Sequence, residues 1–153
     1  MGARSEIKYV DKIFYISGQI DKSFREVASV IPTVGDVRIN LKDLIAINSG
    51  GIREWVVLMH RLAAAQIYFF ECSKFFIDQV NMVKNFVPTN GKIISFYVPF
   101  FSEATKSEKN ILLQIDKHFH GGKRLPFEKV LDDQGNEMEI DIIEAKYFKF
   151  ISG

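Results

Sequence analysis

The stretch "IAINSGGIREWVV", residues 45–57, contains the transition that decides the fold. An apolar run stops at the polar turn Asn48-Ser49-Gly50-Gly51, and a second apolar pattern begins after it. In that second pattern the apolar residues recur at the spacing of one helix face. They stand at positions 52, 55, 56, 59, 62 and 63. The stretch therefore predicts a buried strand, a tight turn and a core-facing helix.

The segments around this stretch alternate between strand and helix patterns. Strands are expected where polar and apolar residues alternate or where apolar runs are continuous, and helices where apolar residues recur every three or four positions. The expected order is a hairpin at 6–21, a helix at 23–31, a strand at 37–47, a strand at 65–73, a helix at 73–86 and a strand at 91–101. This alternation is typical of parallel crossovers, so residues 1–101 are predicted to form an α/β domain.

The last third of the chain has a different pattern. Residues 108–119 alternate like a strand, residues 127–141 read as a hairpin that turns at "DDQG", and residues 142–151 read as a short terminal helix. We therefore expect residues 102–153 to form a small β-rich extension that ends in a short helix.

Composition and charge limit the classes of function. The chain has 153 residues, of which 47% are hydrophobic and 25% are charged, which is typical of a globular domain. The net charge is +1 and the basic residues are spread along the chain, which argues against nucleic acid or a membrane surface as a partner. The longest nearly uncharged run, residues 56–71, is interrupted by His60 and Arg61. Together with a single cysteine, these features predict a cytoplasmic protein.

The motifs of common enzyme classes do not occur. The chain has neither G-x-G-x-x-G nor G-x-x-x-x-G-K-[ST], and Ile47 stands where a nucleophile elbow needs glycine. Cys72 lacks a sequence signature for a histidine partner, and His118 and His120 have no thiol or carboxylate in a known ligand pattern beside them. We therefore expect no enzyme, metal or cofactor. The turn at Ser49 remains either a plain strand-to-helix connection or a site with a special role.

The segment "VRINLKDLIAINSGGIREWVVLMHRLAAAQIYFFECS", residues 37–73, resembles the central part of STAS domains. These domains form the tails of sulfate transporters and the bacterial anti-sigma factor antagonists. Their central part is an apolar strand, a turn similar to D-S-S-G-[LI], a long helix and a second apolar strand. The order of the flanking elements also fits, so the resemblance covers about residues 5–101.

The resemblance implies a phosphorylation site at Ser49. In antagonist members of the family, a partner serine kinase with a histidine-kinase-like ATPase fold phosphorylates the first serine of this turn, and that serine matches Ser49 here. Gly51 and Ile52 match the Gly-Leu/Ile pair of the motif. Asn48 stands where those proteins carry aspartate, and Gly50 replaces the second serine.

By this resemblance the chain is a non-enzymatic signalling protein, an anti-sigma factor antagonist or a related partner-switching module. Its expected partners are an anti-sigma factor or serine kinase, and a phosphatase. The residues expected to line the docking edge around Ser49 are Asn48, Gly50, Gly51, Arg53 and Glu54. Two alternatives remain open: a constitutive interaction or assembly module that is not phosphorylated and can self-associate, and a sensor that binds a small ligand beside the glycines.

The shorter stretch "INSGGIREW", residues 47–55, resembles a bacterial subgroup of STAS proteins in which a zinc-ribbon-like tail follows the last strand. This chain keeps the frame of that tail but not its thiols. The four thiol positions correspond to Ser102, Thr105, Leu131 and Gln134, so we expect a metal-free tail. We expect apolar side chains to dock the tail instead of zinc, namely Phe100, Phe101, Phe127, Met138, Tyr147, Phe148 and Phe150.

Overall fold

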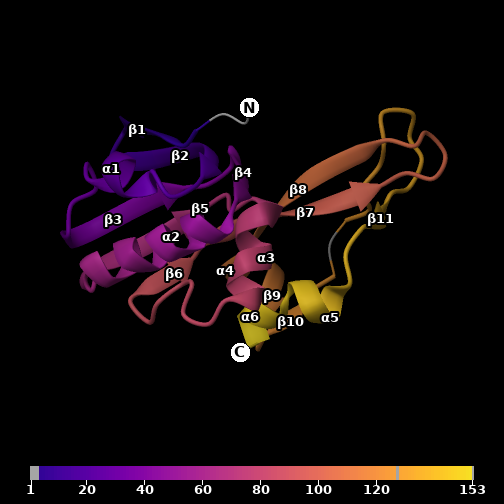
Figure 1. Cartoon of the computed structure of the whole chain (residues 1–153). Coiled ribbons are helices and arrows are strands. Elements are labelled where there is room, and N and C mark those ends of the chain that lie inside the picture. The colour runs from indigo at the N-terminus through magenta and orange to yellow at the C-terminus, as the bar shows by residue number, and fades with distance from the viewer. Residues whose placement is uncertain (1–3, 127, 153) are drawn as a thin grey trace.

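A computed structural model describes residues 4–126 and 128–152, and it has the mixed α/β architecture that the sequence predicts (Figure 1). The main sheet has six strands: β1 (Glu6–Val10), β2 (Ile13–Ile20), β3 (Val34–Asn40), β4 (Leu44–Ile47), β5 (Ala64–Phe70) and β6 (Gly91–Ile93). Their order is β1-β2-β3-β5-β6, and β4 pairs with β2. β1 is antiparallel to β2, whereas the other pairings are parallel. The parallel crossovers predicted from the sequence are confirmed.

Three helices connect the parallel strands: α1 (Phe24–Ala28), α2 (Ser49–Arg61) and α3 (Lys74–Met82). Each crossover moves along the sheet in the same direction, so right-handed crossovers place all three helices on one face of the sheet. The predicted helix at 73–86 is shorter than expected, because α3 ends at Met82. In the part of the chain that the structure describes, no helix has both the length and the apolar character needed to cross a membrane.

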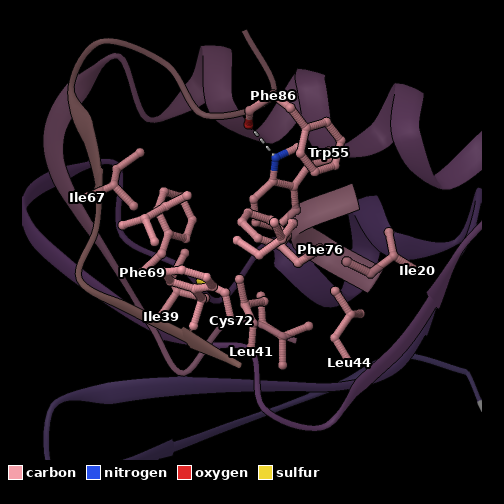
Figure 2. Packing of buried hydrophobic residues seen from close by; sticks show 14 of the residues in the cluster. Ile20, Ile39, Leu41, Leu44, Trp55, Ile67, Phe69, Cys72, Phe76 and Phe86 are labelled. Atoms are coloured by element: carbon pink, nitrogen blue, oxygen red, sulfur yellow. Dashed lines mark hydrogen bonds between the residues drawn. The ribbon is translucent and has the colours of Figure 1, made fainter. Parts of the chain in front are cut away.

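The core forms around Trp55, the only tryptophan, which is fully buried on the inner face of α2 (Figure 2). Its ring contacts aromatic rings from α1, α3, β5 and the loop after α3, at centroid distances of 5.3 to 6.1 Å. These rings belong to Phe24, Phe69, Phe76 and Phe86. The indole Nε1 donates a hydrogen bond of 2.8 Å to the Phe86 carbonyl oxygen, so burying Trp55 leaves no donor unsatisfied.

Two of the predicted strands are each divided in the structure. The prediction of one strand at 37–47 is wrong: β3 ends at Asn40, whose side-chain oxygen accepts a hydrogen bond of 3.0 Å from the Lys42 amide. This turn, typical of asparagine, lets the chain move from β3 to the position of β4 beside β2. The prediction of one strand at 91–101 is also wrong, because β6 stays in the main sheet and β7 (Ser95–Phe101) joins another sheet.

The second sheet consists of β7, β8 (Glu108–Gln114) and β11 (Glu139–Ile140), all antiparallel, with β7 in the centre. β7 and β8 project from the main sheet as an arm (Figure 1). The arm is attached at Cys72, whose amide donates to the Ser95 carbonyl at 3.0 Å and whose carbonyl accepts from the Tyr97 amide at 2.9 Å. The division of the chain at residue 101 stays a prediction, and β7 makes its strand pairs with segments beyond that position.

The remainder of the extension is irregular, with five short elements: α4 (Ile115–His118), β9 (Phe119–His120), β10 (Lys123–Arg124), α5 (Glu144–Tyr147) and α6 (Lys149–Ser152). The strand predicted at 108–119 ends at residue 114, and the predicted terminal helix is two short helices. The hairpin predicted at 127–141 reduces to one antiparallel bridge, Leu131–Glu137, since β11 pairs with β7 instead. Pairing of β11 with the distant strand β7 therefore takes the place of most of the predicted hairpin.

Aromatic side chains hold the extension against the domain. The ring of Phe96 contacts those of Phe119, Tyr147, Phe148 and Phe150 at centroid distances of 5.1 to 6.0 Å. Among the other expected docking residues, Phe100 and Met138 are buried, Phe101 is half-buried outside the core cluster, and Phe127 lies outside the described residues. An apolar docking surface is therefore confirmed for most of the predicted set.

Candidate functional site

Asn48 ends β4 and caps α2. Its backbone is extended, with φ −92° and ψ 178°, and its side-chain oxygen accepts a hydrogen bond of 2.8 Å from the Gly51 amide. Its carbonyl accepts the first helical bond, from the Ile52 amide at 2.9 Å. The cap is neutral and the first turn, residues 49–52, has no acidic side chain. The positive end of the α2 dipole therefore has no charged neighbour within its own turn.

Gly51 holds this turn tightly against the end of β2. A Cβ atom at this position would lie 2.0 Å from the carbonyl oxygen of Ile20, far inside contact distance. The same carbonyl accepts a hydrogen bond of 3.2 Å from the Asn48 amide. Gly50 is less constrained, since a Cβ there would lie 3.3 Å from the Cβ of Lys22. Gly51 is therefore required for close packing, whereas Gly50 is not.

Ser49 is the first residue of α2 and is exposed. Lys22, also exposed, follows β2 and lies beside Gly50, one residue from Ser49. Lys22 was not among the residues predicted from the sequence. Its place beside the turn follows from the strand pairing. Because β2 and β4 are parallel, with Ile20 opposite Ile47, the residues that follow these two strands lie at the same edge of the sheet.

Arg53 and Glu54, the other two predicted docking residues, differ in their surroundings. Arg53 is exposed on the outer face of α2. The Glu54 side chain is only 13% exposed, because its carboxylate accepts hydrogen bonds of 2.8 and 3.2 Å from the Arg25 guanidinium on α1. The Glu54 charge thus holds α1 against α2. The structure brings Asn48, Ser49, Gly50 and Arg53 to the surface at the start of α2. Gly51, which was also predicted to line the docking edge, is buried against the end of β2, and Glu54 is held by Arg25 of α1.

Cys72 and His118, two of the groups considered for catalysis or metal binding, lie in different surroundings. Cys72 is fully buried, and burial raises the pKa of its thiol well above the ordinary value, as expected for an inert core cysteine. The ring Nδ1 of His118 accepts a hydrogen bond of 2.9 Å from the Gln114 amide. Within residues 4–126 and 128–152 there is no group of three His, Cys, Asp or Glu side chains that could hold a metal ion.

In the extension, a carboxylate lies at the centre of the two turns that contain Ser102, Thr105 and Gln134, three of the four positions that the resemblance matches to thiols. The buried side chain of Asp132 accepts hydrogen bonds from the hydroxyls of Ser102 at 2.6 Å and Thr105 at 2.9 Å. It also accepts from the backbone amides of Gln134 and Asn136, each at 2.9 Å. We call these five residues the polar knot. It joins the turn after β7 to the turn before β11.

The polar knot does not fit zinc. Two of its members offer hydroxyls and two offer amide groups, none of which is a usual zinc ligand, and the two oxygens of Asp132 are already occupied by these donors. Leu131, at the third thiol position, has an apolar side chain that is 46% exposed. Ser102, Thr105 and Gln134, which the resemblance matched to thiol positions, all donate to Asp132, a residue that was not predicted to take part.

We predict that the polar knot opens in acid. Its hydrogen bonds, above all the one from the Ser102 hydroxyl, hold the pKa of Asp132 well below its usual value. The carboxylate therefore stabilises the knot fully above its unfolded-state pKa of about 3.9, and this contribution is lost as the pH falls toward the lower folded-state pKa. In NMR spectra, the amide signals of Gln134 and Asn136 should shift together, and only well below the ordinary aspartate pKa of about 3.9. Signals that stay constant in Asp132→Asn and move in wild type support this; identical titration of both proteins contradicts it.

Comparisons with family models, with curated proteins and with solved structures found no match. The class of this protein therefore rests on its own sequence and geometry. These define a mixed α/β domain with helices on one face of its main sheet, an exposed serine at the start of its longest described helix, and a docked antiparallel extension.

Proposed function

We propose that the chain is a STAS-class signalling protein of the cytoplasm that switches between protein partners when Ser49 is phosphorylated. The observation that supports this most strongly is the placement of Ser49, exposed at the start of α2 beside a neutral cap. The alternation of strands and helices along residues 6–93 supports the proposal as well. The expected partners are an anti-sigma factor or serine kinase, and a phosphatase.

A phosphate on Ser49 suits this position electrostatically. It adds roughly −1.5 to −2 charges at neutral pH, at a helix start where backbone amides and the dipole favour an anion. Lys22, beside Gly50, supplies a nearby cation. The phosphate is therefore accommodated without rearranging the core, and it changes the charge of the surface formed by the turn and Arg53. A partner that binds the neutral surface loses affinity for the charged one.

Exposed apolar side chains favour a second candidate, a constitutive interaction module. Leu125, Leu131 and Ile143 of the extension are 40%, 46% and 64% exposed. In this candidate, Ser49 has no regulatory role and the extension supplies the contacts.

Pull-downs from native-cell extract discriminate between the two candidates. The baits are wild type, Ser49→Ala and Ser49→Asp, with Ile143→Asp as a control for the exposed surface of the extension. Under the switch proposal, Ser49→Asp loses a partner that wild type and Ser49→Ala both retain, and Ile143→Asp retains it. If all three Ser49 proteins bind the same partners and only Ile143→Asp loses them, the constitutive module is the better account.

A further inference from the structure

The outer edge of β1 is open. β1 is the last strand at one end of the main sheet, and it pairs with β2 on its inner side (Figure 1). Among the described residues, no other strand pairs with it and no other segment forms a backbone hydrogen bond to its outer side. The strand at the opposite end of the sheet, β6, has three residues, whereas β1 has five. An open edge of this length presents unpaired amides and carbonyls on which another strand can pair.

The turn after β1 determines which backbone groups face the open edge. Val10 lies opposite Ile13, and the two residues between them, 11–12, both have positive φ angles. This is the geometry of a tight two-residue hairpin, in which the residues that flank the turn bond to each other. Hydrogen bonding alternates along an antiparallel pair, so every second residue counted back from Val10 bonds to β2. The amides and carbonyls of Ile7 and Tyr9 therefore point outward.

Apolar side chains border this edge on the face of the sheet that the helices cover. Ile7 and Tyr9 line a hollow of about 450 Å³ together with Phe14, Val30 and Pro32, all of which are apolar. Tyr9 packs against the buried ring of Phe14 at a centroid distance of 4.5 Å. Even so, Tyr9 and Val30 remain 60% and 61% exposed. Covering this surface would favour association through the hydrophobic effect.

Two opposite charges lie on the other face of β1. Glu6 and Lys8 are exposed, and neither has an ion-pair partner in the described part of the chain. Their neighbours across the strand pair, Ser17 and Tyr15, are uncharged. A lysine commonly protects an edge strand from pairing, because it cannot be neutralised there. In β1, a glutamate two positions away on the same face can neutralise the lysine of a second copy.

We infer that this edge pairs with the same edge of a second copy of the chain. The two β1 strands run antiparallel, with Ile7 opposite Ile7 of the second copy, so their outward amides and carbonyls bond to each other. Glu6 of each copy then lies opposite Lys8 of the other, which gives two ion pairs on one face. On the other face, the two Ile7 side chains join the apolar hollows into one strip. Pairing an edge with its own copy closes a twofold dimer and makes the main sheet continuous.

The charges select this register over the neighbouring one. With Tyr9 opposite Ile7 of the second copy, the outward backbone groups are also aligned, but Lys8 then lies opposite Lys8. Like charges directly opposite each other destabilise a strand pair. Glu6 in that register lies opposite Val10 and neutralises nothing. The inference of a dimer through β1 does not depend on phosphorylation of Ser49.

Sedimentation velocity of the full chain, from about 5 to 500 µM, tests the inference. The interface is small, so a dissociation constant of about 10–100 µM is expected. Glu6→Lys and Lys8→Glu each set like charges opposite each other twice, so each should weaken the dimer about tenfold. The double variant Glu6→Lys/Lys8→Glu restores both ion pairs and should recover wild-type affinity within about threefold. Lys92→Glu, the same charge change on exposed β6, should dimerise like wild type.

Amide hydrogen exchange, followed by NMR, locates the contact. The amide of Ile7 should exchange more slowly at high than at low protein concentration, whereas the amide of Lys8, which bonds to β2, should be protected at both. Circular dichroism establishes that each variant is folded, as expected for substitutions at exposed positions. A monomer at every concentration, or a dimer that neither single variant weakens, overturns the inference. Weakening by both single variants without recovery in the double variant contradicts the register.

Discussion

Replacing Gly51 with alanine is expected to destabilise the protein by about 3 kcal/mol or more. The new Cβ would lie 2.0 Å from the carbonyl oxygen of Ile20 and 2.5 Å from its carbonyl carbon. Both are backbone atoms at the end of β2, so no side-chain rotation relieves the overlap, and α2 must move away from the sheet. Because the Asn48 amide bonds to the same carbonyl, the turn that carries Ser49 moves as well.

Gly50→Ala is the matched control, one residue away in the same helix. There the nearest atom is the Lys22 Cβ at 3.3 Å, and an alanine in a helix is favoured over glycine by roughly 0.5–1 kcal/mol. The net change should therefore stay within about 1 kcal/mol. Urea unfolding, followed by the fluorescence of buried Trp55, measures both variants. Equal stability of the two variants would contradict the packing assigned to Gly51.

Trp55→Ala is expected to remove about 3–5 kcal/mol of stability, a large part of the roughly 5–15 kcal/mol that stabilises a typical domain. The substitution deletes the ring at the centre of the aromatic core, which contacts Phe76 and Phe86 (Figure 2). It removes the contact with Phe24 on α1 as well. It also leaves the Phe86 carbonyl without its buried donor. Because Trp55 is the only tryptophan, circular dichroism in urea is the suitable measurement.

Two further substitutions separate packing from the hydrogen bond. Trp55→Phe keeps an aromatic ring but removes the indole donor, so we expect a smaller loss of about 1–3 kcal/mol. Phe75→Ala on α3 removes a ring that is 52% exposed and should change stability by no more than about 0.5 kcal/mol. If Trp55→Ala and Phe75→Ala cost the same, the core is not organised around Trp55 as described.

The sequence correctly predicts the elements whose own residues show a clear helix or strand pattern. The apolar spacing from Ile52 onward predicts α2, and the continuous apolar run predicts β5. The break between β3 and β4 is hidden, because Leu41 and Leu44 keep the run apolar while the Asn40 side chain forms the turn. The departure of β7 from the main sheet depends on pairing with β8 and β11, which local patterns do not encode.

For the candidate site, too, the sequence predicts the local turn but not its contacts with distant segments. Residues adjacent in sequence, from Asn48 to Gly51, form the expected turn at a helix start. Contacts between distant segments were missed: Lys22 beside Gly50, and Arg25 bound to Glu54 across 29 positions. A single sequence shows which residue types are suited to a switch. Which charged residues lie next to the turn depends on strand order and helix packing.

The central claim is tested most directly by the phosphorylation state of Ser49 in the cells that make the protein. The protein is purified from growing and from starved or stressed cells, its intact mass is measured, and any phosphate is located by peptide fragmentation. A Ser49→Ala protein expressed in the same cells is the control. We predict a single phosphate, located on Ser49, whose occupancy changes between conditions and which the variant lacks. Unmodified Ser49 in all conditions, or a phosphate only at other residues, would contradict the switch.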